Sequence, residues 1–122
     1  MATQRSVRRH QDLKVWQMSI RLVKEIYAIT ATFPKDETYG LMSQMRRAAI
    51  SIPSNIAEGA ARTGTREFIQ FIGIARGSLS ELETQLHIAR ELGFIDRPMA
   101  ADATIEELFL MLASLATSLR NR

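Results

Sequence analysis

The sequence contains no cysteine, which excludes disulfide bonds, thiolate nucleophiles and cysteine-ligated metal sites. Only three prolines and six glycines occur among its 122 residues, so long regular elements are expected. No apolar run approaches the roughly 20 residues that a membrane-spanning helix needs, and residues 1–10 lack the apolar stretch of a secretory signal. We therefore expect a cytoplasmic protein that is stabilised by packing and has no membrane partner.

Histidine is scarce as well, and this argues against a catalytic or metal site. The two histidines, His10 and His87, cannot supply the paired Glu-x-x-His motifs of a di-iron bundle. The glycines fit neither a phosphate-binding loop nor a dinucleotide-binding pattern. Ser51 and Ser54 have no histidine nearby in the sequence to activate them, so we expect them to bond the local backbone. These patterns predict a protein with no enzymatic activity and no cofactor.

The apolar residues, in contrast, are plentiful and follow helical periodicity in four segments, 13–33, 41–60, 65–92 and 102–119. Asp12 and Thr65 are predicted N-caps, and Pro34 follows the first segment. Pro53 lies inside the second segment and predicts a kink there, because proline removes a backbone N–H and clashes with the preceding turn. The third segment is the longest, at roughly 40 Å.

Four amphipathic helices with short connections favour an all-α, antiparallel up-and-down four-helix bundle over other helical topologies. A chain of this length builds one hydrophobic core. We therefore predict a single domain over residues 12–122, preceded by a flexible basic arm over residues 1–11.

A second non-polar face remains on the third and fourth helices after the core rows are assigned. Two glycines in a helix interior cost about 1 kcal/mol each relative to alanine, and close approach of another backbone would offset that cost. Such a face favours association of subunits, although the residues could also be merely small and tolerant of solvent. The candidate interface comprises Gly73, Gly77, Ser80, Thr84, Leu110 and Ala113.

The charge is divided unevenly along the chain. Residues 1–66 hold eleven Lys/Arg against five Asp/Glu, whereas residues 67–122 hold five against eight. A basic half permits binding to nucleic acid or to an acidic partner, and it is also compatible with an ordinary solvated surface. The candidate nucleic-acid-binding residues are Arg5, Arg8, Arg9, Arg46, Arg47, Arg62 and Arg66.

Aromatic residues give no obvious stacking platform for bases. Trp16, Tyr27, Phe68 and Phe71 all fall in helical stripes and are expected to be structural. This pattern argues against a dedicated single-strand binder. Arginine–phosphate contacts of the predicted kind would be sensitive to salt and largely independent of sequence.

Several motifs occur in an order that resembles a known family. They are Asp12 to Gln17 (DLKVWQ), Tyr39-Gly40-Leu41 followed by Gln44 to Ala48 (QMRRA), Ser51 to Gly59 (SIPSNIAEG) and Ala75 to Leu86 (ARGSLSELETQL). Together they span residues 11–95 and resemble the bacterial four-helix-bundle proteins encoded within intervening sequences of 23S ribosomal RNA genes.

This resemblance implies a bundle that assembles as a homopentameric barrel. Similar proteins accompany diversity-generating retroelements, where a basic pentameric bundle associates with a reverse transcriptase and nucleic acid. We therefore expect a non-enzymatic homo-oligomer that binds nucleic acid, with ribosomal RNA as the candidate. The alternative is a scaffold or adaptor that binds a protein partner and no nucleic acid.

Overall fold

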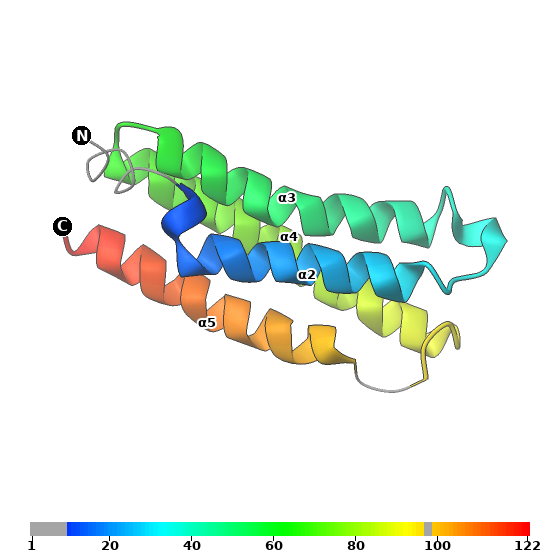
Figure 1. Ribbon diagram of the computed structural model, residues 1–122. Helices are drawn as coiled ribbons and strands as arrows, with labels where there is room; N and C mark the ends of the chain where they lie inside the picture. The colour runs from blue at the N-terminus through cyan, green and yellow to red at the C-terminus, as the bar shows by residue number, and fades with distance from the viewer. Residues whose placement is uncertain (1–9, 97–98) are drawn as a thin grey trace.

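The computed structural model describes residues 10–96 and 99–122, and in this part of the chain all regular structure is helical. The all-α prediction is therefore confirmed. Figure 1 shows the elements in order: η1 (His10–Asp12), α2 (Lys14–Thr30), η2 (Lys35–Glu37), α3 (Leu41–Ala61), α4 (Thr65–Glu91) and α5 (Ala100–Arg120).

The ends of α2 and the N-cap of α4 differ from the prediction. Helix α2 stops at Thr30 rather than Phe33, since the residue before Pro34 is sterically driven out of the helical region. Asp12 is not the N-cap of α2, because it lies in the turn η1 and Leu13 takes that position without a side-chain bond. Thr65 is likewise the first residue of α4, and Gly64 is its N-cap.

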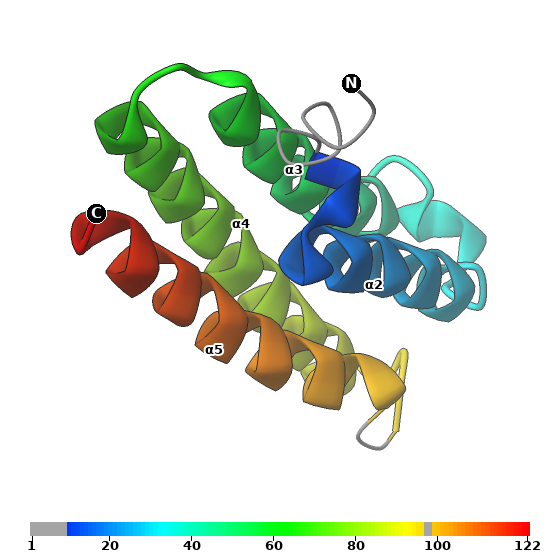
Figure 2. The same ribbon diagram turned by 60° about the vertical axis from the view of Figure 1, so that its left-hand side comes forward.

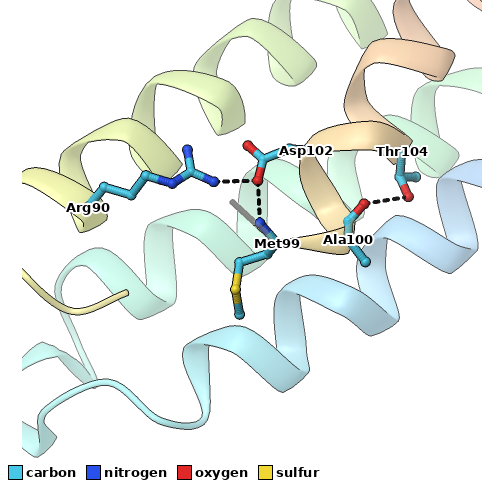
Figure 3. A network of polar contacts seen from close by, with 5 residues as sticks. All are labelled: Arg90, Met99, Ala100, Asp102 and Thr104. Atoms are coloured by element: carbon cyan, nitrogen blue, oxygen red, sulfur yellow. Dashed lines mark hydrogen bonds and ion pairs between the residues drawn. The ribbon is translucent and has the colours of Figure 1, made fainter. Parts of the chain in front are cut away.

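Helix α5 begins at Ala100, two residues before the predicted start. The Asp102 carboxylate accepts a hydrogen bond of 2.6 Å from the backbone N–H of Met99, the N-cap residue. It also binds the Arg90 guanidinium at the end of α4, as Figure 3 shows. A carboxylate in the first turn satisfies an orphan N–H and favours the positive end of the helix dipole. Asp102 thus fixes both the start of α5 and its attachment to α4.

The four long helices surround one hydrophobic core (Figure 1). Helix α2 packs against α3 and α5, and α4 packs against the same two helices. Each helix contributes a row of buried apolar residues to this core, and Leu41, Phe68 and Leu115 are half-buried at its edge. Figure 2 shows α4 and α5 running side by side along their lengths.

Helices α3 and α4 form the most extensive helix pair, and small side chains allow their close approach. A Cβ atom added to Gly59 of α3 would lie 2.7 Å from Cβ of Phe71 on α4, which is closer than real Cβ contacts. Midway along the pair, the Ser51 and Ser78 hydroxyls hydrogen-bond at 2.8 Å, and Asn55 Nδ2 donates to the Ser51 hydroxyl at 2.9 Å. These contacts join the two helices firmly.

Helix α3 continues through Pro53, which is buried, and ends at Ala61. The hydroxyl of Ser54 donates to the carbonyl of Ile50 at 2.9 Å, so this serine bonds the local backbone as expected. None of the described helices has the length and apolar composition that crossing a membrane requires.

Candidate interaction surfaces

Helices α4 and α5 each carry residues of the predicted small-residue surface. Gly73, Gly77, Ser80 and Thr84 of α4 are all exposed, and so is Leu110 of α5, at 73%. Ala113 is half-buried. Ile74, Ile88 and Leu92 add three further exposed apolar side chains to α4. Except for Ala113, the candidate interface residues are therefore exposed within the protomer.

The two glycines in the middle of α4 have no packing role within the protomer. A Cβ added at Gly73 or Gly77 meets no atom within 4 Å outside its own helix. Gly59 of α3, in contrast, is held against Phe71 and Phe68. Since glycine in a helix interior costs about 1 kcal/mol relative to alanine, the cost at Gly73 and Gly77 is not offset inside this fold.

The four candidate arginines in the described part of the chain do not form one cluster. Arg46 and Arg47 lie in the second turn of α3, whereas Arg62 and Arg66 lie beside the α3–α4 connection. Arg47 and Arg62 are about 22 Å apart along α3 at 1.5 Å per residue. The remaining three candidates, Arg5, Arg8 and Arg9, lie outside the described residues.

Arg46 is engaged by the protomer itself. Its Nε donates to the Thr30 hydroxyl at 2.8 Å, and a terminal nitrogen donates to the Tyr27 carbonyl at 3.2 Å. Its guanidinium also lies over the Tyr27 ring, 4.2 Å from the centroid. Three contacts with α2 fix this side chain, so its first role is to join α3 to α2.

Arg62 is also partly engaged, whereas Arg47 and Arg66 are not. Arg62 forms an ion pair of 3.0 Å with Glu58 and lies over the Phe71 ring at 5.1 Å. Arg47 and Arg66 are exposed, and neither side chain makes a hydrogen bond or an ion pair with another described residue. Arg46 and Arg62 are thus held by contacts within the protomer, whereas Arg47 and Arg66 are available to a partner.

A groove lies between α2 and the beginning of α3, next to the available Arg47. It has a volume of about 440 Å³ and is lined by Tyr27, Thr38, Tyr39, Met42, Ser43, Arg46, Arg47 and Ile50. Tyr39 is 96% exposed and Tyr27 is 39% exposed, so Tyr27 is less buried than its place in a helical stripe predicted. Tyr39 was not among the aromatic residues weighed as stacking platforms, although its position outside every helical stripe was a signal that it would face solvent.

The family model described as 23S rRNA-intervening sequence protein matches residues 11–114 of the chain. The chain belongs to this family. The match covers α2, α3 and α4 in full and ends within α5, so the family relationship extends over all four helices of the bundle. No curated protein sequence is found to match the chain.

Two of the segments that resemble this family occupy distinct places in the fold. Ser51 to Gly59 supplies the polar contacts and the close approach that join α3 to α4. Tyr39 to Ala48 contributes to the groove between α2 and α3, through Tyr39, Arg46 and Arg47. One family-like segment therefore builds the bundle, and the other presents side chains at its surface.

Residues 10–96 and 99–122 contain no group of three or more His, Asp or Glu side chains that could hold a metal ion. The most strongly perturbed carboxylate is Asp102. Partial burial tends to raise its pKa, but the hydrogen bonds from Arg90 and Met99 and the Arg90 charge outweigh burial and hold the pKa below its ordinary value. Its capping contacts account for this shift.

Proposed function

We propose that this chain is a non-enzymatic, cytoplasmic, homo-oligomeric protein that binds RNA, with ribosomal RNA as the candidate, through the basic surface of its first half. In this proposal each protomer is an antiparallel up-and-down bundle whose helix α3 bends at Pro53. Five copies associate, as the family resemblance implies, through the small-residue face of α4 and α5.

The observation that carries RNA binding is the availability of cations on and beside α3. Arg47 and Arg66 are exposed without carboxylate partners among the described residues, while Arg46 and Arg62 keep their charge close to the same helix. Arginine pairs with phosphate through charge-assisted hydrogen bonds. Repetition of these cations in an oligomer would enlarge the basic surface without any new contact inside the protomer.

Salt dependence tests this proposal directly. Binding of a fluorescent ribosomal RNA fragment is measured by anisotropy between 50 and 200 mM salt. Two to three phosphate contacts predict an affinity loss of about 10- to 40-fold over this range, because each contact releases a condensed counterion. Absence of binding at micromolar protein in 50 mM salt would refute RNA binding.

The observation that supports association is the exposed non-polar face of α4 and α5, with its two unpacked glycines and the exposed Leu110. Large exposed apolar patches on soluble proteins mark interaction sites. Sedimentation analysis should therefore give a mass several times that of one 13.8 kDa chain. A monomer at cellular concentration would contradict this part of the proposal.

A protein-binding scaffold is the second candidate, and a groove between α2 and α5 favours it. This groove has a volume of about 510 Å³ and is lined largely by apolar side chains, including Leu13, Val15, Leu110, Met111 and Leu115. A partner that is recovered after nuclease treatment by the wild-type protein, and lost with Ser114→Arg in this groove, would support this function. Recovery that depends on intact RNA would support the first.

A further inference from the structure

The groove between α2 and α3 combines a cation, an apolar floor and an exposed aromatic ring. Arg47 is exposed on one side, Met42 and Ile50 supply apolar surface, and Tyr39 stands almost fully in solvent. A volume of about 440 Å³ lies within the range of small-molecule sites, roughly 300–1,000 Å³, and is sufficient for one nucleotide. Tyr39, Arg47 and Ile50 are exposed and lie outside the hydrophobic core, against which Met42 packs from the floor of the groove.

The wall of the groove is held in place by Arg46. Its bonds to Thr30 and to the Tyr27 carbonyl anchor the guanidinium on α2, and the guanidinium then covers the Tyr27 ring. Three contacts fix the position of the charge before any ligand arrives. Such preorganisation lowers the entropic cost of binding an anion.

A second hollow of about 330 Å³ continues from this groove along α2 and α3. The two share Ile50, and the second is lined by His10, Trp16, Ile20, Val23, Pro53, Ser54 and Ala57. His10 and Trp16 meet edge to face there, with ring centroids 5.0 Å apart. A chain-like ligand could therefore extend beyond the first groove.

We propose that the groove is a binding site for an unpaired nucleotide of single-stranded RNA, an inference that rests on the proposed RNA binding. The base stacks on the Tyr39 ring, and the adjoining phosphate pairs with the Arg47 guanidinium. Arg46 acts as a positioning residue that holds Tyr27 and adds positive charge. The sequence prediction that argued against a single-strand binder did not include Tyr39.

Single-stranded RNA fits this groove better than a duplex does. Bases in a duplex are stacked on one another and present only their edges, whereas unpaired bases expose a face to an aromatic ring. Arg47 would contact a phosphate in the same way in single-stranded RNA and in a duplex. Dependence on Tyr39 is therefore the property that separates the two ligands.

Fluorescence anisotropy of the full chain tests the proposal with two probes at 50 mM salt, a labelled 12-nucleotide oligouridylate and a labelled 12-base-pair RNA duplex. We expect Tyr39→Ala to weaken binding of the single strand about tenfold, with little change for the duplex. Tyr39→Phe should bind as the wild type does, because it keeps the ring. Circular dichroism verifies that each variant is folded.

Arg47 is tested in the same assay by comparing two substitutions that each remove one positive charge. Arg47→Gln should weaken both probes and reduce the slope of log affinity against log salt by about 0.7 for the single strand. Arg76→Gln is the control, since Arg76 is exposed on α4, outside the residues that line the groove. It should change either affinity less than twofold.

Three results would overturn the proposal. The base does not stack on Tyr39 if the folded Tyr39→Ala variant binds the single strand like the wild type. The same conclusion holds if this variant loses affinity for both probes equally. If the Arg47→Gln variant binds both probes like Arg76→Gln, Arg47 does not contact a phosphate. In each of these cases wild-type binding would leave the proposed RNA function standing, whereas failure of the wild type to bind either probe would refute both.

Discussion

Alanine substitutions at two glycines, Gly59 and Gly73, should have opposite effects on stability. Both residues lie inside long helices, so replacement by alanine improves helix propensity at each, by up to about 1 kcal/mol. The difference between them lies in what the new methyl group meets. At Gly73 it meets no atom within 4 Å, whereas at Gly59 it would lie 2.7 Å from Phe71 Cβ and 2.9 Å from Phe68 Cδ1.

The contact at Gly59 is hard to relieve, because Phe71 Cβ is attached directly to the backbone of α4. A rotation of the Phe68 ring removes one contact, but the other requires α3 and α4 to separate. Overpacking of this kind costs about 1–3 kcal/mol. After the gain in helix propensity, we expect Gly59→Ala to lose up to about 2 kcal/mol and Gly73→Ala to gain up to about 1 kcal/mol in the protomer, at dilutions where the proposed subunit contacts are absent.

Thermal and urea denaturation, followed by far-ultraviolet circular dichroism, measure both variants against the wild type. A change of 1 kcal/mol corresponds to about 3–5 °C in the melting temperature of a chain of this size. Two protein concentrations are used, since association raises the apparent stability of a folded protomer. Our account of the α3–α4 contact would be wrong if Gly59→Ala were as stable as Gly73→Ala.

Three further predictions concern the α4–α5 junction, the outer face and the α3–α4 contact. Asp102→Asn should destabilise the fold by about 1 kcal/mol at pH 7 through loss of the cap and the Arg90 pair. Because the folded pKa of Asp102 is lowered, its contribution to the free energy of unfolding is complete above the ordinary value of 3.8 and disappears as the pH falls through the folded pKa. Urea denaturation should therefore show a smaller difference in stability between the wild type and Asp102→Asn at pH 3 than at pH 7. Gly77→Leu should reduce the sedimenting mass while leaving the circular dichroism spectrum intact. An unchanged mass would show that this part of α4 does not form the subunit interface. Ser78→Ala, which leaves Ser51 without this partner, should cost about 1 kcal/mol in urea denaturation, and no loss would show that the hydroxyl pair is dispensable.

Sequence periodicity predicted the helices well because it is a local property. Side chains three and four residues apart share one face of a helix, so the rows through Leu22, Ile52 and Leu79 mark the buried sides without any knowledge of the neighbouring helices. Helix ends were less predictable, because capping depends on which side chains fold back to hydrogen-bond the backbone at the helix end. Asp102 was placed at the start of a helix, yet it caps from the third position.

The sequence by itself determined that the chain is helical, that its core rows are apolar and that Gly73 and Gly77 face away from the core. Only the tertiary structure decided which cations are available and which aromatic rings are exposed. Arg46 and Arg47 are neighbours in sequence, but Arg46 is held by Thr30 and Tyr27 on another helix, while Arg47 is exposed. These differences arise from contacts between residues 16 and 19 positions apart, which no helical repeat encodes.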